Sequence, residues 1–289
     1  MTEILDGAAV AKLTNAKTAE RVAKLDKPVT LAVIYDPQND GSRLYVGMKS
    51  KKAATLGIQT KDIPTDANAT TESVLQLVAE LNADDNITGI LVQSPLAEGV
   101  KEREVFSAVA PHKDADGLGA TVQGMLFADA LADYTVAATP QGVMTLLNHY
   151  GIETFGKQAV VVGRSQLFGR PMFALLNNAD ATVTLAHRYT PAADLKRYLK
   201  DADIVVVGVG KPNFINGADL KQGAVVVDVG MNYVDGKAVG DVDFASVQGI
   251  ASYITPVPGG VGPMTIATLL ENTVTLAEQQ QANKKDRSC

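Results

Sequence analysis

Two residues in the segment 42–49 have types and a spacing that suit proton transfer. Tyr45 and Lys49 lie four residues apart, so a helix over this segment places both side chains on one face. A partly desolvated lysine beside an aromatic ring can act as a general acid or base. The alternative is an ordinary surface lysine, and Lys51 and Lys52 favour that interpretation on spacing alone.

Polar residues also follow the apolar run 87–92, which is typical of a buried strand. Gln93 and Ser94 come directly after it. A polar amide at the carboxyl end of a strand can contact a ligand or simply cap a turn, and both interpretations stay open. Asp114 and Asp116 stand in a short acidic turn further on, which lacks the terminal glutamate of a calcium-binding EF-hand loop.

The least ordinary stretch covers residues 254–265. Between residues 256 and 263 it contains three prolines and three glycines, which predict a stiff loop against which a flat ligand can lie. Thr265 is placed to cap the helix that follows. The alternative is a linker, which the apolar content of the stretch disfavours.

A different chemistry is indicated by the segment 159–176. An apolar strand, 159–162, is followed by the turn Gly163–Gly169 and then by a helix over 171–176. A strand, a glycine turn and a helix N-terminus form the phosphate cradle of a dinucleotide-binding fold. The glycine spacing departs from the common G-x-G-x-x-G pattern, so a tight turn without a ligand is the alternative.

The next predicted strand, 181–186, indicates which dinucleotide is bound. NAD-specific folds place an acid at the end of this strand, where it bonds the ribose 2′-hydroxyl. Here the strand ends in His187 and Arg188, and no acid is present. Arg188, with help from Arg164, can pair with a 2′-phosphate, so NADP is favoured over NAD. The alternative is that Arg188 is a solvated surface charge.

Short β-branched runs alternate with helical patterns along the whole chain. Further strands are predicted over 29–35, 204–207 and 224–229, and a helix over 74–81. This alternation predicts an α/β fold with parallel sheets covered on both faces. A closing helix is expected over 264–281, followed by a polar tail, 279–289, that is expected to fray.

Length and composition limit the classes of protein. The chain has 289 residues, which favours two domains, and a net charge of −6, which argues against a nucleic-acid or anionic-membrane partner. Its three histidines lie far apart and its single cysteine is the last residue, so no metal site is expected. The absence of a secretion signal and of long apolar runs favours a cytoplasmic protein.

Seven motifs occur in a characteristic order. They are Tyr45-Val-x-x-Lys49-x-Lys51, Gly89-Ile-Leu-Val-Gln93-x-Pro95-Leu96, Lys113-Asp114-x-Asp116-Gly117, Thr139-Pro-x-Gly142, Gly163-Arg-Ser165, Asp228-Val-Gly230 and Pro256-Val-Pro-Gly-Gly-Val-Gly-Pro-Met-Thr265. From about Leu5 to Glu278 the chain resembles the bifunctional methylenetetrahydrofolate dehydrogenase/cyclohydrolase family.

The resemblance implies two α/β domains with a folate cleft between them. Residues 1–138 would form the catalytic folate-binding domain, with helix 264–281 packed back on it, and residues 139–263 a Rossmann-type NADP-binding domain. The enzyme would oxidise 5,10-methylenetetrahydrofolate with NADP and then hydrolyse the methenyl product to 10-formyltetrahydrofolate, a reaction sequence that serves purine biosynthesis. The family also leads us to expect a homodimer.

The resemblance also implies roles for particular residues. Lys49 would move protons, Gln93 would set its protonation, Tyr45 would stack on the folate and Asp116 would bind the pterin ring. The folate would be lined in addition by Val92, Ser94, Pro258, Gly259, Gly260, Val261 and Gly262. NADP would contact Gly163, Arg164, Ser165, Arg188 and Met231.

The chain departs from the family pattern at a few positions. Ser94 stands where leucine is usual, Ala97 where proline is usual, Val122 where asparagine is usual and Ala138 where cysteine is usual. Two other functions remain in view: an NADP dehydrogenase of the shikimate or amino-acid type, which shares the two-domain plan, and a dinucleotide sensor without enzymatic activity. The proline–glycine loop argues against the first, and the set of Tyr45, Lys49 and Gln93 against the second.

Overall fold

The computed structural model describes residues 1–286 and divides them into two compact α/β units. One unit, here called the six-stranded unit, combines Met1–Lys12 with Thr139–Thr265. The other, the three-stranded unit, combines Leu13–Ala138 with the chain from Ile266 onward.

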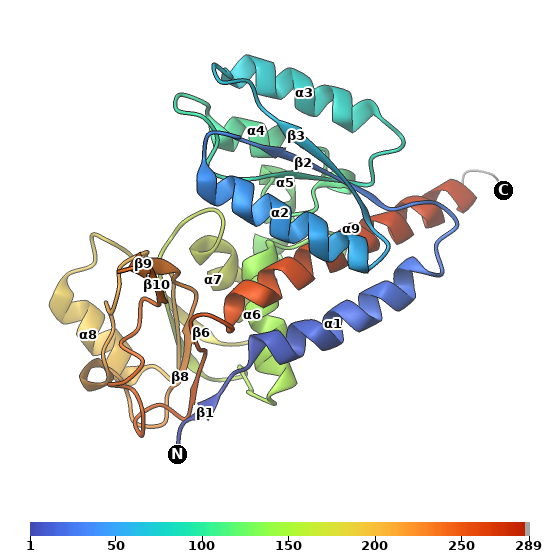
Figure 1. The fold of residues 1–289 in the computed structure, drawn as a ribbon. Helices are drawn as coiled ribbons and strands as arrows, with labels where there is room; N and C mark the ends of the chain where they lie inside the picture. The colour runs from blue at the N-terminus through green and yellow to red at the C-terminus, as the bar shows by residue number, and fades with distance from the viewer. Residues whose placement is uncertain (287–289) are drawn as a thin grey trace. The chain divides into compact units, whose positions relative to one another are not determined.

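The three-stranded unit is built around a parallel sheet with the strand order β3-β2-β4. Its elements are α1 (Gly7–Val22, in part), β2 (Thr30–Tyr35), α2 (Asp40–Thr55), β3 (Gln59–Pro64), α3 (Thr71–Ala83), β4 (Gly89–Val92), α4 (Glu102–Ala108), a 3-10 turn (Pro111–Lys113), α5 (Ala120–Phe127) and most of α9 (Val261–Asp286). Figure 1 shows α3 and α4 on one side of this sheet and α2 and α9 on the other.

The alternation of side chains along β2 explains these two layers. Leu31 and Val33 point into a core that α2 and α9 complete, while Ala32 and Ile34 point into a second core that α3 and α4 complete. A strand buried on both faces is apolar at each buried position, which is why residues 31–34 form one continuous apolar run.

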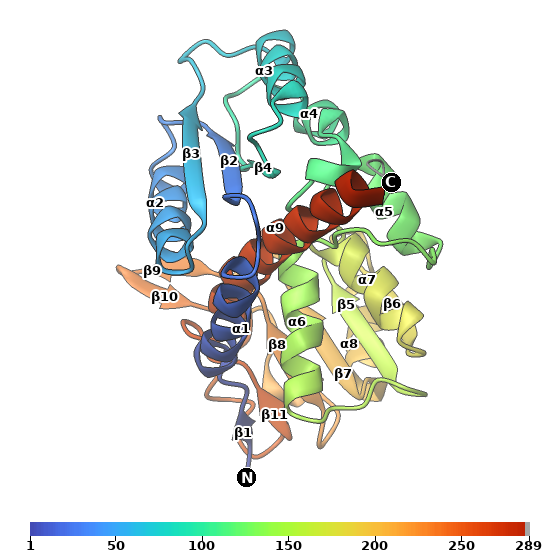
Figure 2. The same cartoon turned by 90° about the vertical axis from the view of Figure 1, so that its right-hand side faces the viewer.

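The six-stranded unit contains a parallel sheet with the order β1-β11-β8-β7-β5-β6. Its elements are β1 (Glu3–Ile4), α6 (Ala138–His149), β5 (Gln158–Val162), α7 (Gly169–Asn178), β6 (Thr182–Ala186), α8 (Ala192–Asp201), β7 (Ile204–Val207), a 3-10 turn (Gly217–Asp219), β8 (Val225–Asp228), the hairpin β9 (Asn232–Val234) and β10 (Lys237–Val239), and β11 (Tyr253–Ile254). Figures 1 and 2 place α6 and α8 on opposite faces of this sheet. The parallel α/β sheets predicted from the sequence are therefore confirmed.

The first residues of the chain differ from the sequence-based grouping, which assigned 1–138 to one domain. Glu3 and Ile4 pair in parallel with Tyr253 and Ile254, so β1 is the edge strand of the six-stranded sheet. The amide of Ala8 also donates to the carbonyl of Gly259 in the proline–glycine loop. Residues 1–12 consequently cluster with the six-stranded unit, because a two-residue strand gains its backbone partners only from a distant segment.

The polar tail is also more ordered than expected. Helix α9 continues to Asp286, and the side-chain amide of Gln280 donates to the carbonyls of Thr88 and His112. The remaining part of the predicted fraying segment, 287–289, lies outside the described residues.

Candidate active site

The lysine singled out by its spacing is buried in the three-stranded unit. Helix α2 follows β2, and the side chain of Asn39 caps it by accepting from the amide of Ser42. Lys49, two turns further along α2, is only 7% exposed, and its Nζ donates to Oε1 of Gln93 over 2.7 Å. The structure therefore rejects the surface-lysine alternative, because the face of α2 that carries Lys49 turns toward the end of β4.

Tyr45 lies one helical turn before Lys49 and is half-buried. Lys51 and Lys52, which favoured a solvated helix face, are exposed on the same helix. The two environments differ because an α-helix turns by about 100° per residue, so neighbours in sequence need not share a face.

Gln93 stands where β4 ends, and both ends of its amide are engaged. Its Oε1 accepts from Lys49 and its Nε2 donates to the carbonyl of Ser94, each over 2.7 Å. Val92, predicted to line the folate site, is buried in the core between the sheet and α3. The hydroxyl of Ser94, also predicted there, donates to the carboxylate of Glu102.

Asp116 completes the charged group around the lysine. It is half-buried, and the attraction between its charge and the Lys49 ammonium opposes the effect of burial on both residues. Burial lowers the pKa of Lys49 from its ordinary value, against the attraction of Asp116. Burial raises the pKa of Asp116 to about 6, and Asp114 adds to this rise by like-charge repulsion.

Asp114 is a residue whose role the sequence left open. Its carboxylate is buried and accepts from the amides of Leu118 and Gly119, while the hydroxyl of Thr135 donates to its carbonyl. These bonds shape the turn that presents Asp116. Burial raises the pKa of Asp114 to about 6, although the backbone amides around it act in the opposite direction.

The glycine turn of the six-stranded unit has the shape that a phosphate cradle requires. Gly163 follows β5 with φ +128°, and a Cβ there would lie 2.6 Å from the carbonyl oxygen of Gly208. A Cβ on Gly169, the first residue of α7, would lie 1.9 Å from the carbonyl oxygen of Gly163. The hydroxyl of Ser165 accepts from the amide of Phe168. The turn is thus closed tightly against the helix start, and only glycine fits at these two positions.

Two arginines gather beside this turn around one aromatic ring. The guanidinium of Arg188 lies 4.8 Å from the centre of the Tyr189 ring, and that of Arg164 lies 5.7 Å from it. Neither forms an ion pair with a carboxylate of the described side chains. Two uncommitted cations where β6 ends fit a 2′-phosphate, so the residues present suit NADP.

Sequence reasoning missed two buried carboxylates that shape the neighbouring loops. Asp241 is fully buried and accepts from the amides of Gly210 and Lys211, which follow β7. Asp228, at the end of β8, accepts from the amide of Gly230 and from that of Asp241 itself. Burial raises the pKa of Asp228 to about 6, against these backbone donors. The sequence motif Asp228-Val-Gly230 contains the second of these carboxylates but assigns it no role, and no motif contains Asp241.

Met231 and the proline–glycine loop also belong to the six-stranded unit. Met231 follows β8, and its Cε would lie 3.7 Å from a Cβ on Gly262. Pro258 is exposed, whereas Gly260 and Val261 are buried. Thr265 does not cap the last helix as expected, because α9 already begins at Val261, and its hydroxyl instead bonds that of Thr139. The predicted folate-lining residues are thus divided between the two units of the chain.

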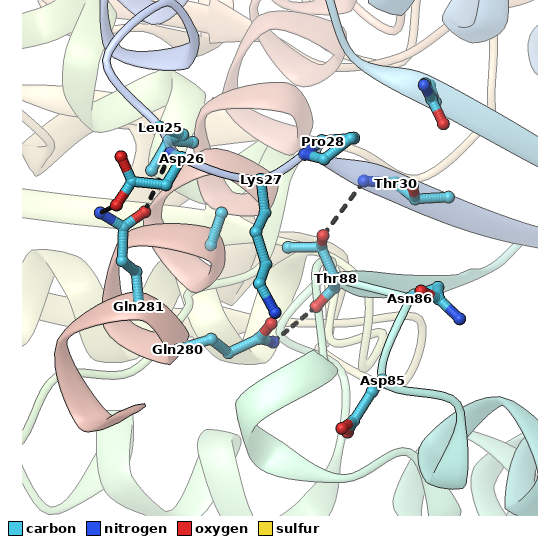
Figure 3. A pocket seen from close by; sticks show the side chains of 12 residues that line it. Leu25, Asp26, Lys27, Pro28, Thr30, Asp85, Asn86, Thr88, Gln280 and Gln281 are labelled. Carbon is cyan, nitrogen blue, oxygen red and sulfur yellow. Dashed lines mark hydrogen bonds between the residues drawn. The ribbon is translucent and has the colours of Figure 1, made fainter. Parts of the chain in front are cut away.

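A cavity of about 460 Å³ lies in the three-stranded unit, but at the amino ends of the strands, opposite the end where Gln93 stands. Its lining includes Gln59 at the start of β3. Figure 3 labels three more of its lining residues, Thr30 at the start of β2, Thr88 just before β4 and Gln280 of α9. Ligands of open α/β sheets bind at the carboxyl ends of the strands, where Gln93 stands. We therefore place the candidate active site at that end.

Among the described residues, no group of three histidine, cysteine, aspartate or glutamate side chains is arranged to hold a metal ion. Nor does any helix within residues 1–286 combine the length and apolar character that crossing a membrane requires.

One unit of the chain has a parallel sheet with a glycine turn and two unpaired arginines, and the second α/β unit has a buried lysine. Together these features define a two-domain enzyme of the dinucleotide-dependent class. The catalytic-domain description of the tetrahydrofolate dehydrogenase/cyclohydrolase family matches residues 5–116, and its NAD(P)-binding domain matches residues 137–281. The chain belongs to the tetrahydrofolate dehydrogenase/cyclohydrolase family.

Individual relatives are similar to this chain along nearly its whole length. The bifunctional protein FolD of Leuconostoc citreum is 86% identical, covering 98% of this chain and 100% of its own. The crystal structure of FolD from Campylobacter jejuni is 40% identical with a TM-score of 0.93, covering 97% of this chain and all of that one. The Trypanosoma brucei enzyme, solved with NADP and an inhibitor, is 37% identical with a TM-score of 0.91, over 96% and 98% of the two chains.

The shikimate-dehydrogenase alternative has a structural counterpart as well. Shikimate dehydrogenase from Aquifex aeolicus has a TM-score of 0.52 at 15% identity, over 87% of this chain and 97% of that one. At that identity the likeness concerns the fold alone.

Proposed function

We propose that this chain catalyses two consecutive reactions of folate one-carbon metabolism. The first is the NADP-dependent oxidation of 5,10-methylenetetrahydrofolate to 5,10-methenyltetrahydrofolate. The second is hydrolysis of that product to 10-formyltetrahydrofolate. The observation that carries the proposal is a buried lysine in a chain of this family. Lys49 donates a hydrogen bond to Gln93, and the charge of Asp116 attracts its ammonium group. The relatives named bifunctional proteins support it across the full length.

In the hydrolytic reaction, Lys49 is the group that moves protons. Water adds to the methenyl carbon and loses one proton. The bond from that carbon to one folate nitrogen then breaks as the nitrogen gains a proton, and the added hydroxyl loses its proton to become the formyl oxygen. A buried amine whose pKa is lowered below its ordinary value can take up and give back these protons. Gln93 accepts from the Lys49 ammonium, and Asp116 provides a counter-charge. These contacts orient the amine and bias its protonation.

In the oxidative reaction, the chain's residues bind and align. NADP⁺, when bound, supplies the hydride-accepting chemistry. We assign Gly163, Arg164, Ser165, Arg188 and Met231 to its site, with the free guanidinium groups at its 2′-phosphate. Tyr45 stacks on the folate and Asp116 accepts from its pterin ring. Ser94, Val92 and the loop residues Pro258, Gly259, Gly260, Val261 and Gly262 complete the folate site, Val92 and Ser94 contributing their backbone.

Three broader expectations rest on family membership. We propose that the protein acts as a homodimer, that it works in the cytoplasm and that its product serves purine biosynthesis. We also expect that it has no nucleic-acid or membrane partner, since its net charge is −6.

One spectroscopic assay tests the proposal against the two alternatives. The purified chain is mixed with NADP and either 5,10-methylenetetrahydrofolate, shikimate or no substrate, and absorbance of the reduced nicotinamide is followed. We expect an increase with the folate alone, and then decay of the methenyl absorbance at a rate above that without enzyme. An increase with shikimate alone would support the other dehydrogenase class. No turnover with either substrate, despite NADP binding, would support a sensor.

A further inference from the structure

The turn after β4 is tied to a carboxylate on the next helix. Glu102, in the first turn of α4, accepts from the hydroxyl of Ser94 at 3.0 Å on each of its oxygens and from the amide of Leu96 at 2.7 Å. Among the described side chains, no lysine or arginine forms an ion pair with Glu102. Its charge is therefore directed at the turn, where charge-assisted bonds are stronger than neutral ones.

The same turn determines which way the amide of Gln93 faces. A side-chain amide has an accepting oxygen at one end and a donating nitrogen at the other. The carbonyl of Ser94 accepts from Nε2 of Gln93 at 2.7 Å, which leaves Oε1 directed at Nζ of Lys49. If the carbonyl of Ser94 moved away, the amide could turn over and present its donor nitrogen to the lysine, which cannot accept from it when charged.

We propose that Glu102 and Ser94 are positioning residues for the hydrolytic reaction. They hold the turn so that Gln93 keeps its oxygen on the amine of Lys49. This rests on the proposed role of Lys49 as the proton-transfer group. The chain of contacts runs from Glu102 through Ser94 and Gln93 to Lys49, entirely within the three-stranded unit.

The arrangement predicts which kinetic quantity changes. Loss of the carboxylate frees the turn, removes an acceptor from the Lys49 ammonium and so favours the neutral amine. The charged groups that act on this amine are Asp116 directly and Asp114 through Asp116, and neither is altered. The lysine-dependent limb of the pH–rate profile should consequently move to lower pH.

The experiment compares Glu102→Ala with Glu104→Ala, a matched control on the same helix. Glu104 is exposed and pairs with the exposed Lys101. For Glu102→Ala we expect the hydrolytic kcat to fall about tenfold, the size of one lost bond to a charged group. We also expect the lysine-dependent limb of the pH–rate profile to move to lower pH, and the folate KM and the dehydrogenase rate to change by a smaller factor than the hydrolytic kcat. Glu102→Gln, which retains an acceptor, should recover most of the rate.

Two further variants keep the outcome interpretable. Ser94→Ala removes the hydroxyl without touching α4, and it serves if Glu102→Ala does not fold; Ser94→Thr should restore the contact. A Glu102→Ala or Ser94→Ala enzyme with the pH profile and kcat of Glu104→Ala would overturn the positioning role. Lys49→Gln is measured in parallel: if it hydrolyses at the parent rate, the proposed function itself fails, whatever the Glu102 variants do.

Discussion

Nζ of Lys49 and Oε1 of Gln93 lie 2.7 Å apart, and this one hydrogen bond joins helix α2 to the carboxyl end of β4. It gives a buried amine an acceptor that carries no charge. A carboxylate in the same place would hold the proton on the amine far more strongly, which would hinder its release. Asp116 supplies the counter-charge separately, so the two contacts can influence the lysine in different ways.

Replacing Lys49 should separate the two reactions. Lys49→Gln keeps a hydrogen-bonding end but exchanges no proton at neutral pH. We expect hydrolysis of methenyltetrahydrofolate to fall at least ~100-fold, the lower end of what a positioned acid–base group contributes. Dehydrogenase activity should fall less, since it depends on alignment, and NADP affinity should be nearly unchanged. Loss of the methenyl absorbance measures the first, nicotinamide absorbance the second and fluorescence titration the third.

Arg188→Ala should weaken NADP binding and leave NAD binding nearly unchanged. The free guanidinium beside Tyr189 would lose a charge-assisted phosphate contact, which costs about 1.5–3 kcal/mol, or roughly ten- to a hundredfold in affinity. Arg197→Ala is the matched control, because that arginine is exposed on α8 and already paired with Asp194. Equal losses of NADP and NAD affinity would contradict the assignment of Arg188 to the 2′-phosphate.

Asp116 should make stability depend on pH. Its pKa is about 6 in the folded protein and about 4 in an unfolded chain, so the folded state holds the proton more tightly. Its contribution to stability is complete below pH 4 and is lost as the pH rises through 6. Two pH units correspond to about 3 kcal/mol, and partial exposure reduces this to about 1–2 kcal/mol.

The Asp116→Asn variant isolates this contribution. Urea titrations at pH 4.5 and 7.5 give the free energy of unfolding of the variant and of the parent. The difference between the two proteins should shift in favour of the variant at the higher pH. Parallel behaviour of the two proteins across that range would show that Asp116 titrates alike in the folded and unfolded states.

Gly169→Ala should disrupt the dinucleotide turn. Its Cβ would lie 1.9 Å from the carbonyl oxygen of Gly163, so the turn must open, at a cost of about 1–3 kcal/mol. A lower Tm and weaker NADP binding are expected. Gly124→Ala on α5 is the control, since its Cβ meets nothing within 4 Å and should stabilise the helix by about 0.5–1 kcal/mol. Unchanged NADP affinity in Gly169→Ala would argue that the turn does not hold the phosphates.

Much of the architecture follows from local pattern. The runs 31–34, 159–162 and 204–207 are apolar at successive positions because their strands are buried on both faces, and each lies in a strand of the structure. The missing acid after 181–186 is equally local, as it depends only on which residue follows one strand. The order of the seven motifs indicated the family. A single motif made of common turn residues does not define it.

Tertiary structure alone decided the environment of the reactive groups. Lys49 is buried while Lys51 and Lys52 are exposed, and spacing favoured the opposite interpretation of Lys49. Burial of a side chain depends on which face of α2 packs on β2 and β3, and that is set by packing between separate segments of the chain. Likewise β1 becomes a strand only because β11, near the other end of the chain, provides its hydrogen-bond partners. A sequence records the chemistry each residue can perform, whereas desolvation, which sets the pKa of Lys49 and Asp116, exists only once distant segments have packed together.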